Sequence, residues 1–378
     1  MDFNYSDMQQ MLLDSAGKLI ADTYTLEDIR HQRTIANGLN EKNWAQFAEL
    51  GWLALPIPED AGGLGCGLED VVVLSTALGR GLAVEPYVST VVVGGHIVGA
   101  LADEDARNAL LGQVATGAAR IALAHGEPGE RFGDGGARST QAVPSGNGFA
   151  LTGRKMLVLD APSATHIIVS ATLDDGSMGL FLAPRDASGI SDESYALVDG
   201  AAASDLFLDG VQVDAGALIA SGSAAETLLS EASDRAAIAL MAQAVGAMEG
   251  CNDVSAEYIK ERKQFGQPIG KFQALQHIMA DMFVSTHQAR SMVYYALAHL
   301  DASPEDRQAA VSAAKVLVGT AAQLVSRSGI QLHGGYGVTD EYIVSHYYRR
   351  LLALEKLFGD IDHHVRRLAV HMFDRADA

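Results

Sequence analysis

The most informative part of this chain is Arg262-Lys-Gln-Phe-Gly-Gln-Pro-Ile-Gly-Lys-Phe-Gln273. Its first residue, Arg262, carries a planar fork of N–H donors that suits phosphate oxygens, and Phe265 offers a flat apolar face for a ring system. A second stretch, Gln331-Leu-His-Gly-Gly-Tyr-Gly337, contains adjacent glycines that let main-chain N–H groups come close to a ligand. Either stretch alone also fits a surface ion pair and a helix end. The two together favour a site for a long dinucleotide with a pyrophosphate and two rings.

The composition is that of a globular protein. The chain has 378 residues, of which 48% are hydrophobic, so it is long enough for two or three domains with their own cores. A formal net charge of −20 argues against a nucleic acid or an anionic membrane surface as a partner, because both attract basic patches. The start of the chain lacks the features of a signal peptide, and its two cysteines, Cys66 and Cys251, are far apart. We therefore expect a cytoplasmic protein with free thiols.

Hydrophobic periodicity divides the chain into three expected domains. Residues 1–118 show helical spacing of apolar residues, and residues 225–378 show it most strongly. Between them, residues 119–224 contain short β-type runs separated by turns such as Phe132-Gly-Asp-Gly-Gly-Ala137, which predicts a small barrel or sandwich. In the last domain the pattern predicts four helices, at 226–260, 272–300, 304–329 and 341–374.

The two opening stretches resemble the signatures of the acyl-CoA dehydrogenase family. Arg262-Lys-Gln-Phe-Gly, followed by Phe272-Gln-Ala-Leu-Gln-His-Ile-Met-Ala-Asp-Met282, is similar to its first C-terminal signature, and Gln331 to Gly337 is similar to its second. The resemblance runs essentially end to end, and includes Pro58-Glu-Asp-Ala-Gly-Gly63 and Glu127-Pro128. It implies an α+β fold with an N-terminal helical domain, a middle β-barrel or sandwich domain and a C-terminal four-helix bundle.

The resemblance also implies a cofactor and partners. In the family, the Arg and Phe of the first signature contact the pyrophosphate and adenosine part of FAD, and the Gln and Gly of the second contact the FAD of a neighbouring subunit. Carried over by motif position, the FAD-binding residues of this chain are Arg262, Phe265, Gln273, Gln331, Gly334 and Gly335. The family further implies an acyl-CoA substrate, an electron-transfer flavoprotein as electron acceptor, and a tetramer.

The catalytic base is where this chain departs from the family. Desaturation of an acyl thioester requires a carboxylate that removes the α-proton while the flavin accepts the β-hydrogen as hydride. The usual position of the family's Glu, counted from the second signature, is Phe358, and an alternative position on the first long C-terminal helix is Ala236. Asp360 is the nearest substitute base, although an aspartate there also suits a helix cap. Two further carboxylates are the next candidates: Asp234 and Glu355.

Contacts to the flavin ring are altered as well. Family members carry a Thr before the Glu-Pro of the β domain and a Trp-x-Thr/Ser after its Gly-x-Lys segment, whereas this chain has Gly126, Leu157 and Leu159. The adenosine-side signatures are thus kept, while the base and the ring-side hydroxyls are changed. This combination resembles the smaller subunit of two-gene dehydrogenases such as the pimeloyl-CoA type, in which a partner chain provides the Glu.

We therefore interpret the chain as a FAD-dependent acyl-CoA dehydrogenase that desaturates an acyl-CoA between Cα and Cβ. It would act as a homotetramer, or as a heterotetramer with a larger homologous subunit. Two alternatives remain open: a non-catalytic subunit that only completes a partner's FAD site, and a flavoenzyme similar to nitroalkane oxidases that uses Asp360 as its base. No metal site is expected, because the adjacent His363 and His364 point to different helix faces and have no third ligand.

Overall fold

The computed structural model describes residues 5–130, 132 and 139–376, and the chain divides into two compact units. A helical unit combines Met1–His31, Leu68–Ala83 and Ala237–Ala378, and a β unit combines Gln32–Gly67 with Val84–Ala236. Each unit therefore joins segments that are far apart in sequence. The Gly-rich turn expected at 132–137 lies, apart from Phe132, outside the described residues.

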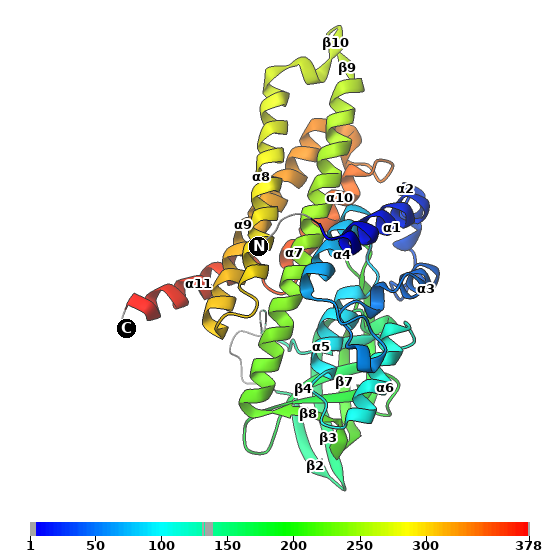
Figure 1. Ribbon diagram of the computed structural model, residues 1–378, viewed down its shortest axis with the longest axis vertical. Coiled ribbons are helices and arrows are strands. Elements are labelled where there is room, and N and C mark those ends of the chain that lie inside the picture. The colour runs from blue at the N-terminus through cyan, green and yellow to red at the C-terminus, as the bar shows by residue number, and fades with distance from the viewer. Residues whose placement is uncertain (1–4, 131, 133–138, 377–378) are drawn as a thin grey trace. The chain divides into compact units, whose positions relative to one another are not determined.

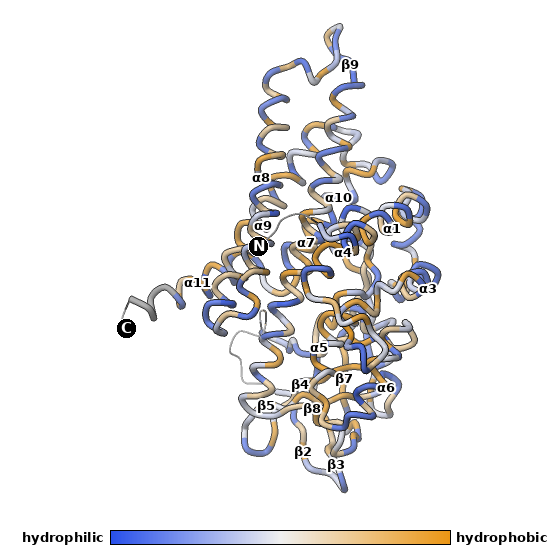
Figure 2. The backbone as a smooth tube through the Cα atoms, in the orientation of Figure 1, coloured by the Kyte–Doolittle hydropathy of each residue, from blue (hydrophilic) through white to orange (hydrophobic). Residues whose placement is uncertain are grey.

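The helical unit is built on long helices of the C-terminal half (Figure 1). Its elements are α1 (Asp7–Thr23), α2 (Leu26–Gln32), α4 (Leu68–Arg80), most of α7 (Gly222–Glu261), the hairpin β9 (Lys263–Gln264) and β10 (Gln267–Pro268), α8 (Gln273–Ala298), α9 (Pro304–His333), the short turn Gly334–Val338, α10 (Val344–Lys356) and α11 (Ile361–Ala376). Figure 2 shows hydrophilic and hydrophobic residues alternating along α8 and α9, as expected for helices with one buried face.

Local sequence explains where these helices begin. Ser6 and Gln9 form a reciprocal capping box at the start of α1. Ser303 accepts a hydrogen bond from the Asp306 N–H, and Pro304 occupies the first turn of α9. By length and composition Pro304–Val338 could cross a membrane, but 61% of its most apolar window is buried, which is typical of a core helix.

The expected helix over 341–374 is wrong as a single element. The structure breaks it into α10 and α11 at Leu357-Phe358-Gly359-Asp360. Phe358 and Gly359 both have positive φ, +53° and +100°, and two consecutive residues in this region cannot continue a right-handed helix. A Cβ on Gly359 would lie 2.5 Å from the His364 ring, so packing also requires glycine there.

The β unit contains one eight-stranded sheet and several short helices. The helices are α3 (Glu41–Glu49), α5 (Gly95–Val98) with the π-helical turn Val88–Gly94 before it, and α6 (Glu104–Ala115). The strands are β1 (Ile121–Ala124), β2 (Gln141–Ser145), β3 (Gly148–Leu159), β4 (His166–Thr172), β5 (Met178–Pro184), β6 (Ile190–Ala196), β7 (Ala202–Asp214) and β8 (Leu218–Ser221).

The strand order is β6-β7-β3-β2-β4-β5-β8, and β1 pairs with β4 in parallel. The β2–β4 contact is also parallel, and the other pairs are antiparallel. Buried side chains such as Leu151, Ile167 and Phe181 form the core of the sheet. The register between β3 and β7 shifts between Lys155 and Val158, and this bulge interrupts β3 in its second half.

Two glycines fix the packing of α4 against α7 within the helical unit. A Cβ on Gly79 would lie 1.9 Å from the Gln243 carbonyl oxygen, and a Cβ on Gly246 would lie 1.8 Å from the Thr76 carbonyl oxygen. Neither distance is compatible with a side chain, so the two backbones touch. Because neither glycine has a positive φ, close approach alone requires glycine at these positions.

We expect Gly246→Ala to destabilise the protein by about 1–3 kcal/mol or more, because the added methyl group forces α4 and α7 apart. Gly17→Ala is the matched control: Gly17 lies exposed within α1, and its Cβ would meet no atom within 4 Å. That change should stabilise the helix by about 0.5–1 kcal/mol. Denaturant midpoints of the two variants measure the difference, and equal midpoints would contradict the packing.

Candidate functional site

Tyr258 brings the two signature stretches together in the helical unit. It lies in the last turn of α7, where its carbonyl accepts a hydrogen bond from the Arg262 N–H at 2.8 Å. Its ring lies 4.3 Å from the ring of His333, and its hydroxyl donates to the His333 carbonyl oxygen at 3.4 Å. One residue therefore links the start of the first stretch to the middle of the second.

The first stretch forms a hairpin where the chain turns from α7 into α8 (Figure 1). Phe265 lies at its tip with a φ of +52° and a side chain that is 91% exposed. Its main side-chain neighbour is Phe272, in an edge-to-face contact at 6.0 Å. A non-glycine residue with left-handed backbone is uncommon and strained. Such a ring, held out into solvent, is suited to a flat ligand or a second chain.

Three polar side chains of the two stretches, those of Arg262, Gln273 and Gln331, are also exposed. In the described part of the chain, no side-chain hydrogen bond or ion pair involves the guanidinium of Arg262 or the carboxamides of Gln273 and Gln331. The N–H groups of such an arginine are available to a phosphate or a carboxylate of another molecule.

The glycines of the second stretch differ in what requires them. Gly334 has a φ of +61°, which favours glycine, and a Cβ on Gly337 would lie 2.8 Å from the His333 Cβ. Gly335 has neither constraint, since its φ is not positive and its Cβ would meet no atom within 4 Å. Neither the conformation nor the packing of this unit therefore requires glycine at 335. The absence of a side chain there instead suits a ligand that approaches the peptide closely. The residues present thus fit the phosphate and adenosine part of a dinucleotide.

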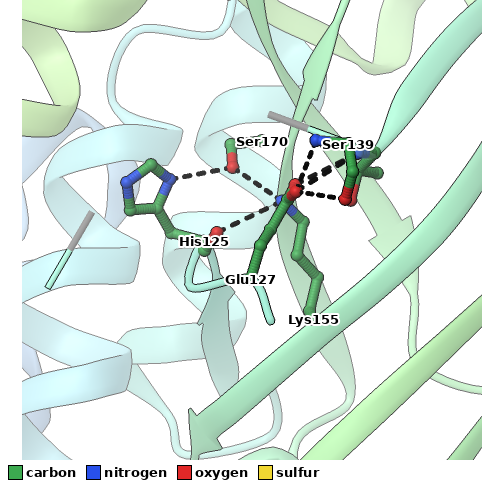
Figure 3. Close-up of polar contacts among 6 residues, drawn as sticks. His125, Glu127, Ser139, Lys155 and Ser170 are labelled. Atoms are coloured by element: carbon green, nitrogen blue, oxygen red, sulfur yellow. Dashed lines mark hydrogen bonds and ion pairs between the residues drawn. The ribbon is translucent and has the colours of Figure 1, made fainter. Parts of the chain in front are cut away.

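Glu127 and Lys155 form a buried ion pair in the β unit (Figure 3). The Lys155 Nζ lies 2.6 Å from the Glu127 Oε1 and also donates to the Ser170 hydroxyl at 3.1 Å and to the His125 carbonyl at 3.2 Å. The carboxylate accepts two further hydrogen bonds from Ser139. Burial alone would raise the pKa of Glu127, but the hydrogen bonds from Lys155 and its neighbours lower that pKa to about 2.

The ring-side departures lie beside this pair, on the β3 bulge. Met156 donates its N–H to the Gly126 carbonyl at 2.8 Å, which joins the end of β1 to the bulge. Leu157 has a φ of +51° and a side chain that is 50% exposed, and its N–H donates to Asp205 at 3.1 Å. Where the family presents hydroxyls, this bulge presents an aliphatic side chain to solvent.

Asp360, the expected substitute base, caps α11. Its Oδ1 accepts the His363 N–H at 2.9 Å, its Oδ2 lies 3.6 Å from the Lys356 Nζ, and it is only 2% exposed. Glu355, a further candidate, accepts the Ile361 N–H at 3.2 Å at the same helix start. Both carboxylates therefore have structural roles at this break, whereas Asp234 is buried on α7 in the β unit.

Two buried side chains, those of Lys315 and His364, bind the turn that contains Phe358. Lys315 donates to the Leu357 carbonyl at 2.8 Å, and the His364 Nε2 lies 3.0 Å from the Phe358 carbonyl. Burial lowers the pKa of His364 to about 3, so the ring is neutral. Because a carbonyl oxygen only accepts, the Nε2–H donates the hydrogen bond to the Phe358 carbonyl. The Nδ1 then accepts from the Ser312 hydroxyl at 3.2 Å.

Burial likewise lowers the pKa of Lys315 to about 8, although Glu355 and Asp360 oppose that shift. The carbonyls of Leu357 and Phe358 are thus both fixed by hydrogen bonds. They hold in place Phe358, the residue at the position of the family's base, which has no carboxylate.

The structure therefore brings all six expected cofactor residues into the helical unit, in two stretches joined by Tyr258. It also places residues that the sequence did not single out. Tyr258 precedes Arg262 by one helical turn, which was a visible signal. Nothing in the sequence pointed to Lys315 or to a structural role for His364, because both residues bind the turn at Phe358, which only the structure shows.

Two domain families match the sequence. Residues 6–118 match "Acyl-CoA dehydrogenase, N-terminal domain" and residues 227–373 match "Acyl-CoA dehydrogenase, C-terminal domain".

Solved structures are similar over almost their whole length. A variant of the Tcur3481-Tcur3483 steroid ACAD shares 30% identity, covers 98% of this chain and 99% of its own, and has a TM-score of 0.89. The ChsE4-ChsE5 complex from Mycobacterium tuberculosis shares 26% identity, covers 99% of each chain, and has a TM-score of 0.90. Among relatives compared by sequence, the caffeyl-CoA reductase-Etf complex subunit CarC of Acetobacterium woodii is 29% identical over 314 residues, which are 80% of this chain and 82% of its own.

We expect Lys155→Met to cost about 3–5 kcal/mol, because it leaves the Glu127 carboxylate buried without its counter-charge. Adding Glu127→Gln to this variant should recover much of the loss, since removal of both partners leaves no buried charge. Because the folded-state pKa of Glu127 is lowered, its contribution is complete above about pH 4.5 and is lost as the pH falls towards 2. Denaturation of the single and double variants at neutral pH measures the pair, and equal stabilities would contradict it.

Proposed function

The chain belongs to the acyl-CoA dehydrogenase family, and from this premise we propose that it is the smaller subunit of a heteromeric FAD-dependent acyl-CoA dehydrogenase. Its larger homologous subunit would supply the catalytic glutamate. As a family member the chain is a flavin-dependent oxidoreductase, and its cofactor is FAD. One contrast carries the proposal: the adenosine-side residues are intact and exposed, while Phe358 stands at the position of the base.

The intact half of the cofactor site supports a role across a subunit interface. FAD supplies the acceptor for the β-hydrogen of the substrate when it is bound. Arg262 would hold its pyrophosphate, Gln273 and Gln331 would donate to its sugar and phosphate oxygens, and Gly335 would let the backbone approach. Because these groups find no partner within the described residues of their own chain, they are available to a cofactor held mainly by another subunit.

The altered half supports a base from elsewhere. Removal of the α-proton needs a carboxylate that can reach the substrate and accept a proton. Phe358 cannot do so, and the carboxylate of Asp360 is buried as a helix cap beside Lys356. The same contacts weigh against a reaction of the nitroalkane-oxidase type with Asp360 as base. The glutamate of a larger partner is therefore the simpler source.

Relatives support a mixed assembly and an electron-transfer partner. One similar structure is named as the ChsE4-ChsE5 complex, another carries the double name Tcur3481-Tcur3483, and a further relative is named as a subunit of an Etf complex. One of them is described as a steroid ACAD, so steroid acyl-CoA thioesters belong in a substrate panel beside linear ones.

An exposed apolar surface on α8 also suits a partner subunit. Phe283, Val284 and Tyr295 are 58%, 52% and 44% exposed along this helix. Large apolar side chains left exposed on a helix are typical of protein interfaces. We propose that the larger homologous subunit covers them in a tetramer.

The direct test is to purify the chain alone and together with the larger homologue, and to record flavin absorbance and acyl-CoA oxidation for both preparations. We expect stoichiometric flavin and turnover only in the pair. Full turnover by the chain alone would refute the proposal, and flavin without turnover in the pair would favour a non-catalytic role.

Arg262→Ala should weaken FAD binding by about 1.5–3 kcal/mol, or roughly 10–150-fold, because a charge-assisted phosphate contact is lost. Lys263→Ala is the matched control, since Lys263 belongs to β9 and pairs with Pro268 across the hairpin. Its effect should be less than about twofold, apart from a small electrostatic contribution. Flavin titration of the pair compares the variants, and equal affinities would contradict the assignment of Arg262.

Asp360→Asn separates a base from a cap. Asparagine caps helices as well as aspartate does, so α11 should remain intact while the ionisable group is removed. If the partner supplies the glutamate, the pair should retain almost full turnover. A loss of about 10²–10⁴-fold, as expected for removal of a catalytic base, would identify Asp360 as that base.

A further inference from the structure

A crevice lies where α4, α7 and α8 meet in the helical unit. It has a volume of about 300 Å³ and is partly open to solvent. Four valines and Ala242 give it apolar walls, and the side chains of Tyr5, Arg290 and Tyr294 contribute its polar groups. The Thr76 hydroxyl, which also lines the crevice, is already bound to a carbonyl of its own helix. An apolar space with a few polar groups is the usual form of a small-molecule site.

Tyr5, in the segment that precedes α1, is seated at this crevice. Its hydroxyl and that of Tyr294 form a hydrogen bond in which either can donate. Burial, followed by the interaction with Tyr5, raises the pKa of Tyr294 to about 12, so Tyr294 keeps its proton at neutral pH. Tyr5 is 46% exposed, so about half of its surface is withdrawn from water. The chain thus places one of its own phenol groups at the crevice.

Local contacts that do not involve the Tyr5 ring hold the start of α1. Ser6 and Gln9 form the capping box of this helix. The Gln9 Nε2 also donates to the Asp70 Oδ1 at 2.9 Å, which ties α1 to α4, the helix that forms one wall of the crevice. A substitution of Tyr5 should therefore change what fills the crevice and leave α1 in place.

The charged groups beside the crevice balance one another. Arg290 forms an ion pair with Glu249, whose carboxylate also lies 3.9 Å from the Arg80 guanidinium. Arg80 in turn pairs with Asp253 at 2.5 Å. Two cations thus face two carboxylates, and this balance disfavours an anion as a ligand. A neutral molecule with an apolar body and one hydroxyl, as in a phenol, matches the apolar walls and the Tyr294 hydroxyl.

We infer that the crevice is a binding site for small neutral phenols and that Tyr5 closes it as an internal ligand. This inference goes beyond the proposed function, because none of the residues assigned to FAD or to the acyl-CoA reaction takes part. A ligand must displace the Tyr5 ring from the intact chain, so the segment before α1 acts as a strap that competes with the ligand. Once that ring is removed, a phenol from solution should take its place. The matching probe is 4-methylphenol, which has the atoms of the tyrosine side chain.

The test titrates the purified chain in a calorimeter with 4-methylphenol and with toluene, which has the same ring and methyl group but no hydroxyl. Tyr5→Ala should bind 4-methylphenol about tenfold more tightly than the wild type, because a half-buried aromatic ring no longer has to be displaced. Adding Tyr294→Phe to this variant should weaken 4-methylphenol binding by about 2–12-fold through the loss of one hydrogen bond, and should leave toluene binding unchanged. Met11→Ala, 72% exposed on α1, is the matched control and should bind like the wild type.

Three results would overturn the inference. Equal affinities of the wild type and Tyr5→Ala for 4-methylphenol would show that Tyr5 does not occupy the site, and no measurable binding to Tyr5→Ala would show that the site does not exist. Equal changes for toluene and 4-methylphenol on adding Tyr294→Phe would show that the crevice does not recognise the hydroxyl. A cooperative thermal transition without ligand shows that each variant is folded. None of these results bears on the proposed function, which flavin binding and turnover test without any phenol.

Discussion

The backbone contact between α4 and α7 is the constraint on which the helical unit depends. Gly79 and Gly246 each bring a Cα against a carbonyl oxygen of the facing helix, so the two helices fit in one register only. That register fixes the axial position of α7, and therefore the position of its last turn. Tyr258 and Arg262 project from this turn. The close contact between these two helices thus determines where Arg262, the proposed phosphate-binding residue, is presented.

In both units a buried ammonium lies beside a backbone segment with unusual geometry. In the β unit, Lys155 and Glu127 pair beside the bulge that carries Leu157. In the helical unit, Lys315 donates to carbonyls at the end of α10, next to Phe358. Both segments contain a non-glycine residue with positive φ. In the helical unit the buried ammonium satisfies carbonyls of that segment itself, whereas in the β unit Lys155 donates to Glu127, Ser170 and the His125 carbonyl beside the bulge.

Much of the fold could be predicted from the sequence because periodicity reports which face of an element is buried. The expected helix at 226–260 differs from α7 by only a few residues at its start. The break at Phe358 could not be predicted in this way, since its turn depends on Lys315, which lies 42 residues earlier than the carbonyl it binds. The two signatures predicted the exposed half of the proposed site, but the ring cluster around His333 exists only after distant segments pack.

The lowered pKa of Lys315 has an energetic meaning for the turn at Phe358. A lysine titrates below its usual range only when its hydrogen bonds and nearby carboxylates compensate for less than the lost hydration. At neutral pH the folded chain therefore carries an ammonium that it would hold more easily in water. The helical unit gives up some stability to keep this turn in shape, even though the residue at its centre has no acid–base chemistry. The shape of the turn is thus held at an energetic cost that proton transfer at its centre does not explain.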